Sequence, residues 1–176
     1  SVKHDVQQRS EDDLTHIIIS IKKANQSLQD KLNQNANEMF EKRKIKYEKA
    51  GSAISTFDVN KFTNRNLRPV PRQLHVSEGY IVEKDASGFQ SVSLQKLSSI
   101  YAIVRAWSNP REFTIEYIDG SYRTYTTGVR DSLLALLMDV CHASGNTKVV
   151  VTGEVSDKLR LMPRFTEEVY EASLKD

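Results

Sequence analysis

Apolar and polar residues follow one period at the start of the chain and another after it, and the change falls near Gly51-Ser52. From Leu14 to Ala50 there is no Pro or Gly, and apolar residues recur at alternating spacings of three and four. The residues of this seam are Leu14, Ile18, Ile21, Leu28, Leu32 and Met39, with Asn25 and Asn35 as polar breaks. Such spacing is typical of a helix with a coiled-coil-like seam.

We predict a long helix for this segment, beginning at a capping-box-like Ser10 to Asp13 after frayed polar residues 1–9. A helix of ~37 residues spans roughly 55 Å at 1.5 Å per residue. Alternatively, the asparagine-rich run from Asn33 to Asn37 marks a bend between two shorter helices. The apolar seam of this helix also has two interpretations. The helix is a spacer that packs on a neighbouring element, or it pairs with a second copy of itself as a coiled coil.

After Gly51 the period becomes that of strands, most clearly between Ser98 and Asn146. The patterns predict strands over 100–106, 112–118 and 122–126, because apolar Phe113, Ile115 and Tyr117 alternate with polar residues. Asp119-Gly120 predicts a two-residue turn in which both residues take positive φ. We interpret Glu112 and Glu116, on one strand face, as solvated carboxylates.

A strongly apolar helix follows these strands. It is expected to begin near Thr127 or Gly128, with Asp131 in its first turn, where a carboxylate favours the positive end of the helix dipole. Its apolar stripe consists of Leu133, Leu134, Leu137, Val140 and Cys141. Gly145 is expected to supply a left-handed C-terminal cap. The helix should therefore close one end of a small bent sheet.

The remaining strands are shorter. Upstream, apolar positions predict strands around 57–61, 74–76, 80–83 and 89–94, while Thr63 to Pro71 is predicted to be loop because Pro69 and Pro71 disfavour a central strand. Downstream, 148–152 is one extra strand or an extended exit. Residues 164–174 suggest a short helix that starts at Thr166.

These elements predict an α+β chain: a pleckstrin-homology-like, bent antiparallel β-barrel of about seven strands, closed by a C-terminal amphipathic helix and preceded by a long helical segment. We expect a helical N-terminal segment at 1–51, the pleckstrin-homology-like domain at 52–153, and a C-terminal extension with a short helix at 154–176. Strands do not alternate with helices, which argues against a parallel α/β sheet.

Composition excludes several classes of function. The 176 residues carry a formal charge of +2 and one cysteine, Cys141, which is expected to be a core residue. No apolar run reaches transmembrane length, and no signal-peptide pattern is present. The four histidines have no metal-ligand spacing, and the glycines form no phosphate-binding loop. We therefore expect no catalytic residues, no metal site and no cofactor, and interpret the chain as a non-enzyme.

Charge clusters at one place, from Glu41 to Arg72, where nine basic and three acidic residues leave +6. The residues that flank the predicted loop between the first two strands of the barrel are Lys61, Arg65, Arg68 and Arg72. In pleckstrin-homology domains this loop usually holds the basic side chains that bind phosphoinositide headgroups, because arginine forms paired hydrogen bonds to phosphate. These four residues are our candidate lipid contacts. The alternative is a solvated loop whose charges protect an edge strand; without interleaved aromatics, nucleic acid is not expected.

Two motifs carry a resemblance to a known family. FTIEYIDGSYRTYTT followed by GVRDSLLALLMDVCHASGN, with YIVEKD and SSIYAIVRAWSNP more faintly, resembles a pleckstrin-homology-like repeat near the N-terminus of the receptor-mediated-endocytosis J-domain proteins. These proteins are very large endosomal Hsp70 co-chaperones. The likeness covers roughly half of the chain, and residues 1–50 match nothing in it.

The resemblance implies a cytoplasmic module, peripheral on the early endosome membrane, that contributes to association with phosphatidylinositol 3-phosphate and to endosomal sorting. It implies a phosphoinositide membrane surface and endosomal sorting proteins as partners, and an Hsp70-type chaperone that is bound through other parts of the full-length protein. No His-Pro-Asp tripeptide occurs, so the J-domain activity cannot lie in this piece. The other interpretation is a protein-interaction or architectural repeat that binds no lipid.

Overall fold

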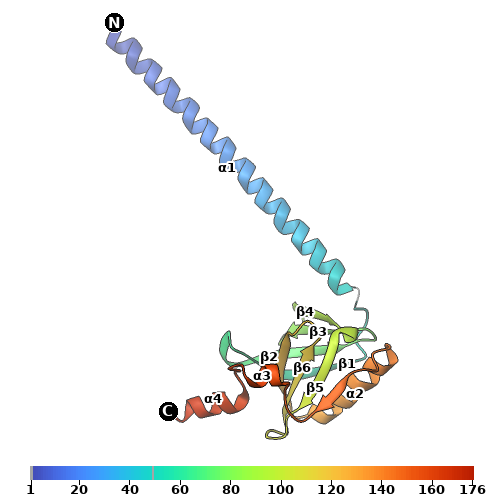
Figure 1. Cartoon of the computed structure of the whole chain (residues 1–176). Coiled ribbons are helices and arrows are strands. Elements are labelled where there is room, and N and C mark those ends of the chain that lie inside the picture. The colour runs from blue at the N-terminus through green and yellow to red at the C-terminus, as the bar shows by residue number, and fades with distance from the viewer. Residues whose placement is uncertain (1, 49) are drawn as a thin grey trace. The chain divides into compact units, whose positions relative to one another are not determined.

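The computed structural model describes residues 2–48 and 50–176, apart from the side chains of residues 3–6 and 40–48. The chain divides into two compact units, Ser1–Ile45 and Lys46–Asp176. The first unit lies within one helix, and the second contains all the strands (Figure 1). The domain limits at 51 and 153 stay predictions. The basic side chains predicted to cluster at Lys42, Arg43, Lys44, Lys46 and Lys49 lie outside the described residues.

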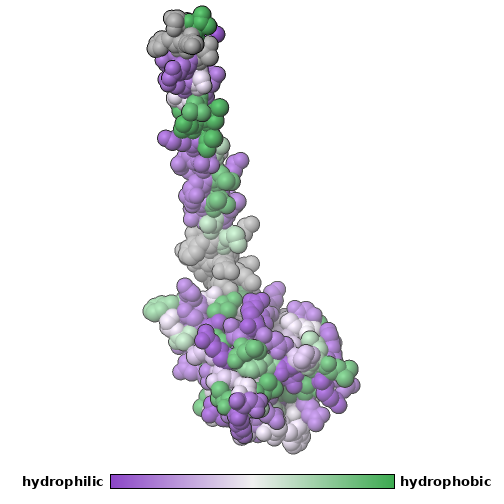
Figure 2. Space-filling view, turned by 90° about the vertical axis from the view of Figure 1, so that its left-hand side faces the viewer, coloured by the Kyte–Doolittle hydropathy of each residue, from purple (hydrophilic) through white to green (hydrophobic). Residues whose placement is uncertain are grey.

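The N-terminal helix α1 runs without interruption from Val2 to Glu48. The predicted start at Ser10 is therefore wrong, and of the two interpretations of residues 33–37 the continuous helix is confirmed and the bend is wrong. Polar side chains four residues apart hydrogen-bond across the asparagine-rich region, such as Gln29 Nε2 to Asn33 Oδ1 at 3.1 Å, and such pairs stabilise a helix. The seam residues are all exposed, and Figure 2 shows hydrophobic patches along the helix.

The second unit is built on one eight-stranded sheet with the order β4-β3-β2-β1-β7-β6-β5-β8. The strands are β1 (Ser55–Thr63), β2 (Asn66–Val76), β3 (Tyr80–Asp85), β4 (Ser91–Lys96), β5 (Ile100–Arg105), β6 (Glu112–Tyr117), β7 (Tyr122–Thr126) and β8 (Val150–Thr152). The pairs from β4 to β5 are antiparallel, and β8 adds to β5 in parallel. The short η1 (Leu97–Ser99) connects β4 to β5. Two antiparallel meanders joined through β1 and β7, followed by one helix, are the predicted pleckstrin-homology-like fold.

The helix α2 (Arg130–Ala143) closes this sheet, with α2 drawn along the sheet in Figure 1. Its predicted stripe is buried in one apolar cluster with residues of both meanders, among them Leu74 of β2 and Phe113 of β6. Because residues from both halves of the strand order pack with one helix in a single apolar cluster, the sheet must be strongly bent. The helix begins at Arg130, two to three residues later than predicted, and Val129 at its N-cap makes no side-chain cap.

The end of α2 confirms the glycine prediction. Gly145 has a φ of 94°, its amide donates to His142 O at 3.0 Å, and the Asn146 amide donates to Cys141 O at 2.9 Å. This pair of bonds is a Schellman cap. The Asn146 side chain then donates to Leu97 O and Ile100 O, which ties the helix end to the start of β5.

Two local predictions fail for identifiable reasons. Residues 66–71 belong to β2, in the stretch that pairs with β1, and not to a loop. On the other side of β2, β3 pairs only from Arg72 onward. Pro69 and Pro71 thus lie where one edge of β2 is free, a position that needs no amide donor. In the β6–β7 turn only Gly120 has positive φ, at 86°, and the Asp119 carboxylate instead accepts from the Ser121 amide at 2.8 Å. The prediction of a two-residue turn with positive φ at both residues is therefore wrong.

The C-terminal segment packs on the sheet through α3 (Asp157–Arg160) and α4 (Glu167–Leu174). Thr166 caps α4, as predicted, by accepting from the Val169 amide. Ser156 donates to the carboxylate of Glu116, which is only 6 % exposed, so the interpretation of Glu116 as solvated is wrong. Burial also raises the pKa of Glu112, which is half-buried and not freely solvated.

Candidate anion-binding site

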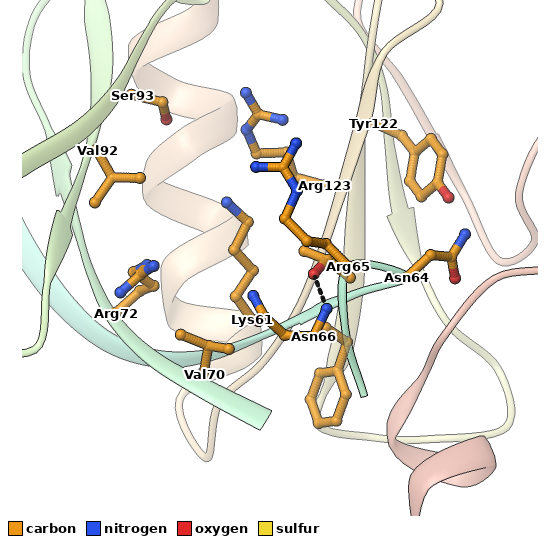
Figure 3. Close-up of a pocket in the computed structure, with 12 residues that line it drawn as sticks. Lys61, Asn64, Arg65, Asn66, Val70, Arg72, Val92, Ser93, Tyr122 and Arg123 are labelled. Atoms are coloured by element: carbon orange, nitrogen blue, oxygen red, sulfur yellow. Dashed lines mark hydrogen bonds between the residues drawn. The ribbon is translucent and has the colours of Figure 1, made fainter. Parts of the chain in front are cut away.

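A hollow of about 480 Å³ lies between the β1–β2 turn, β4 and the start of β7. Its size falls within the range of ligand pockets, roughly 300–1,000 Å³. Four basic side chains line it, and Figure 3 shows the ends of Lys61 and Arg123 directed into the same space. The cationic lining residues are Lys61, Arg65, Arg72 and Arg123. Polar atoms for the recognition of an anion therefore surround this space.

Strand pairing explains how residues sixty positions apart meet here. Lys61 of β1 pairs with Tyr125 of β7, and Arg123 is two residues from Tyr125 and so lies on the same face of β7. Arg72 belongs to β2, the other neighbour of β1. The long central strand β1 thus brings cations of three strands to one end of the sheet.

Arg65 is placed by the turn between β1 and β2. Thr63 Oγ1 accepts from the Asn66 amide at 3.2 Å, the bond marked in Figure 3. Asn64 anchors the same turn to the C-terminal segment: its Oδ1 accepts from the Phe165 amide at 2.8 Å, and its Nδ2 donates to Pro163 O at 3.0 Å. The turn is therefore held from both sides while the Arg65 side chain stays exposed.

A buried carboxylate lies beside these cations. Glu83 of β3 is 1 % exposed. Its Oε2 accepts from Lys61 Nζ at 2.8 Å and lies 3.4 Å from Arg72 Nε, while its Oε1 accepts from the Tyr125 hydroxyl at 2.6 Å. Glu83 thus connects two of the lining cations to the core of the domain.

The environment changes the acidity of both partners of Glu83. Burial, reinforced by the nearby Glu83 charge, raises the pKa of Tyr125 well above its ordinary value, so this tyrosine stays a hydrogen-bond donor. Burial lowers the pKa of Lys61, and the hydrogen bond to Glu83 opposes that effect. The positive charges of Arg123 and Arg72 lower the pKa of Lys61 further. A bound anion would stabilise the charged form of Lys61.

Two donors at this hollow have no protein acceptor. Arg72 Nε and Arg123 Nε are both shielded from solvent, and no residue that the structure describes accepts a hydrogen bond from either. The 3.4 Å between Arg72 Nε and Glu83 is an ion-pair distance without hydrogen-bond geometry. Shielded donors without acceptors are costly in a folded protein, and an anionic ligand would supply acceptors for them.

The structure brings together three of the four candidate residues. Lys61, Arg65 and Arg72 line the hollow, whereas Arg68 is exposed on β2 and does not. Arg123 lines it too and was missed, because it lies far outside the basic segment that ends at Arg72. The signal that could have found it is its place in β7, the strand that pairs with β1 in the predicted fold. Lipid contact by these residues stays a prediction.

Two further features of the described residues bear on the site. Among the side chains that the structure describes, which exclude those of residues 3–6 and 40–48, no group of three or more from His, Cys, Asp or Glu is arranged to hold a metal ion. None of the helices within residues 2–48 and 50–176 is long and apolar enough to cross a membrane.

Comparisons with known proteins give one sequence relative. No protein-family model matches the chain. The chain is 31 % identical over 83 residues to "DnaJ homolog subfamily C GRV2" of Arabidopsis thaliana, a match that covers 47 % of this chain and 3 % of the relative. The chain therefore spans a very small part of the relative's length. This finding is consistent with the resemblance to the J-domain co-chaperones.

Similar solved structures include pleckstrin-homology domains. A C-terminal domain of an unknown protein from Leishmania infantum has a TM-score of 0.48 at 13 % identity, covering 61 % of this chain and 98 % of that one. The C-terminal PH domain of pleckstrin, crystallised with D-myo-Ins(1,2,3,5,6)P5, has 0.46 at 16 %, covering 53 % and 97 %. The Slm1-PH domain with inositol-4-phosphate has 0.41 at 11 %, covering 52 % and 97 %. At these scores the fold assignment rests on the strand order and the closing helix described above.

Proposed function

We propose that the chain is a non-catalytic pleckstrin-like module of an endosomal co-chaperone scaffold, and that its basic hollow binds a phosphoinositide headgroup, with phosphatidylinositol 3-phosphate as the ligand. The observation that carries this proposal is the set of four cations around one hollow, two of them with shielded guanidinium donors that have no acceptor. Guanidinium groups bind phosphate oxygens through paired hydrogen bonds. The sequence relative, a DnaJ homolog, supports the co-chaperone part of the proposal.

The proposed setting follows from the same resemblance. The module would lie on the cytoplasmic face of the early endosome and contribute to endosomal sorting with sorting proteins as partners. An Hsp70-type chaperone would be engaged by other parts of the full-length protein. Lysine and arginine near an anionic leaflet each add about 1 kcal/mol of attraction, so the exposed Arg65 and Arg68 would support membrane association even where they do not line the hollow.

Vesicle flotation tests the proposal with a variant that leaves Glu83 paired. The double variant Arg65→Ala/Arg123→Ala removes two lining cations, neither of which contacts Glu83. We expect it to lose at least about tenfold in binding to phosphatidylcholine vesicles that contain phosphatidylinositol 3-phosphate, since charge-assisted hydrogen bonds contribute about 1.5–3 kcal/mol each.

The matched control is Lys96→Ala/Lys148→Ala, which removes the same charge from exposed positions away from the hollow. It should bind almost as the unaltered chain does. Equal losses of vesicle binding in the two variants would mean that the vesicle is attracted by the overall positive charge of the domain, and that the hollow is not the lipid site. Absence of phosphoinositide-dependent flotation in the unaltered chain would overturn the lipid proposal itself.

The alternative function, a protein-interaction or architectural repeat without lipid binding, is favoured by α1. Its seam residues are exposed along a helix of 47 residues, and a coiled-coil-like seam buries such residues against another helix. Light scattering of the whole chain, compared with Ile18→Glu/Leu32→Glu, tests for self-association. An unaltered chain that is dimeric, and a monomeric variant, would support this function; a monomer in both cases would contradict a self-pairing seam.

A further inference from the structure

We propose that Glu83 acts as an internal counterion that restricts the basic hollow to headgroups with a single monoester phosphate. This inference rests on the proposed function. The charge of the hollow carries the argument: four cationic side chains line it, and the carboxylate of Glu83 lies 2.8 Å from Lys61 Nζ and 3.4 Å from Arg72 Nε. Glu83 is not itself a lining residue, so it acts on the ligand through charge and not through contact.

The formal charge of the hollow matches the charge of a headgroup with one monoester phosphate. Four cations and one carboxylate leave a formal charge of +3 at the hollow. A phosphoinositide with one monoester phosphate carries roughly −2.5 to −3, about −1.5 to −2 from the monoester and −1 from the phosphodiester. A second monoester phosphate would bring about two more negative charges that the hollow does not balance. Without Glu83 the hollow would carry one more positive charge and would suit a more highly charged headgroup.

The position of Glu83 explains why its charge reaches the ligand. The side chain is 1 % exposed, so water screens it little, and its interaction with charges a few ångströms away is stronger than at the surface. Its two oxygens are held by Lys61 and by the Tyr125 hydroxyl, which keeps the negative charge at a constant place beneath the hollow. The same bond takes up one of the three donors of Lys61, so fewer remain for a second phosphate.

The experiment compares two kinds of phosphatidylcholine vesicle, one with phosphatidylinositol 3-phosphate and one with an equal fraction of a phosphatidylinositol bisphosphate that carries the same 3-phosphate. The unaltered chain should bind the monophosphate more tightly than the bisphosphate. Glu83→Gln removes the charge and keeps an oxygen that can accept from Tyr125. We expect it to increase the ratio of bisphosphate to monophosphate binding by about fivefold or more.

A second variant keeps the test decisive if Glu83→Gln fails to fold, which circular dichroism would reveal. Val92→Lys adds a positive charge at a lining residue that is 42 % exposed, without touching Glu83. It should shift the ratio in the same direction. Its matched control is Val150→Lys, at a similarly exposed position of β8 outside the hollow, which should leave the ratio unchanged.

The outcomes separate this inference from the proposed function. Monophosphate binding with an unchanged ratio in the folded variants overturns the role of Glu83 and leaves the lipid site standing, as does an unaltered chain that binds the bisphosphate as tightly as the monophosphate or more tightly. No binding of either lipid by the unaltered chain overturns the proposed function, and the inference with it.

Discussion

Two clusters in this domain each place two basic side chains on one carboxylate, and they differ in what surrounds the carboxylate. Glu83 is 1 % exposed and is shared by Lys61 and Arg72, whereas the side chain of Asp131 is 62 % exposed and is shared by Arg105 and Arg130. The first cluster lies beside a hollow, and the second lies at the start of α2.

The donors of the two clusters also differ. In the Asp131 cluster the Arg130 guanidinium is buried, and its NH1 donates to the carbonyl oxygens of Ala106, Asn109 and Glu112. That arginine ties the start of α2 to the connection between β5 and β6 and has a structural role. In the Glu83 cluster Arg72 Nε has no acceptor. Basic residues of similar appearance in the sequence therefore differ in their surroundings: Arg130 of one cluster completes the fold, and Arg72 of the other has a shielded donor without a protein acceptor.

The largest expected effect comes from removing a cation from the buried carboxylate. Lys61→Met keeps most of the aliphatic stem but leaves Glu83 with Arg72 as its remaining cation, at 3.4 Å. We expect the free energy of unfolding to fall by about 3 kcal/mol, because an inadequately compensated buried charge is strongly destabilising. Urea unfolding at neutral pH measures this. Arg105→Met, at the exposed pair, should change stability very little. Similar losses of stability in the two variants would contradict the expectation that burial of the carboxylate decides the cost of removing its cation.

A smaller effect should follow when both partners are changed. In Lys61→Met/Glu83→Gln both members of the Lys61–Glu83 pair are neutral, and the glutamine oxygen can still accept from Tyr125. We expect the double variant to be more stable than the sum of the two single losses by about 2 kcal/mol, since contacting residues that share one network are not additive. The same urea experiments give this coupling. Arg105→Met/Asp131→Asn is the matched cycle, and it should be additive.

Sequence patterns predicted the fold well because the core follows them. The period-two strands and the stripe of α2 are direct consequences of which residues are buried, and Gly145 is needed where the helix end takes positive φ. The prolines of β2 misled because the pattern cannot tell that β3 covers only part of that strand. The length of α1 was underestimated because the predicted start rested on a local capping signal at Ser10, whereas the helix continues through that residue from Val2.

Only some of the residues at the candidate site could be predicted from the sequence. Lys61, Arg65 and Arg72 lie close together in the chain, so local charge was enough to find them. Arg123 and Glu83 come from strands that reach the site only through long-range pairing, and a charge count along the chain cannot place them. Arg68 was included because it is near in sequence, although it does not line the hollow. Proximity in sequence is thus a weak guide to which charges share a site in a sheet.

The smallest expected effect is the response of the exposed cluster to acid. The hydrogen bonds from Arg105, and then from Arg130, lower the pKa of Asp131 from 3.8 to about 2. Because the folded-state pKa lies below the ordinary value, any contribution of Asp131 to stability is present above pH 3.8 and is lost as the pH falls through about 2. Carboxyl-carbon NMR titration of the folded chain should therefore give a pKa of about 2 for Asp131.

The same titration, repeated with Arg105 changed, tests which of the two arginines lowers the pKa of Asp131. Arg105→Met should raise the pKa of Asp131 part of the way toward 3.8, since the Arg130 bond at 3.0 Å is kept. The urea midpoint at neutral pH should change little, because an exposed pair is screened by water and salt. A large shift in acidity together with a small change in stability would show that the pair is charged and formed but contributes little to the fold. A pKa that stays at about 2 in Arg105→Met would instead assign the effect to Arg130, and would make this cluster as dependent on a buried cation as the one at Glu83.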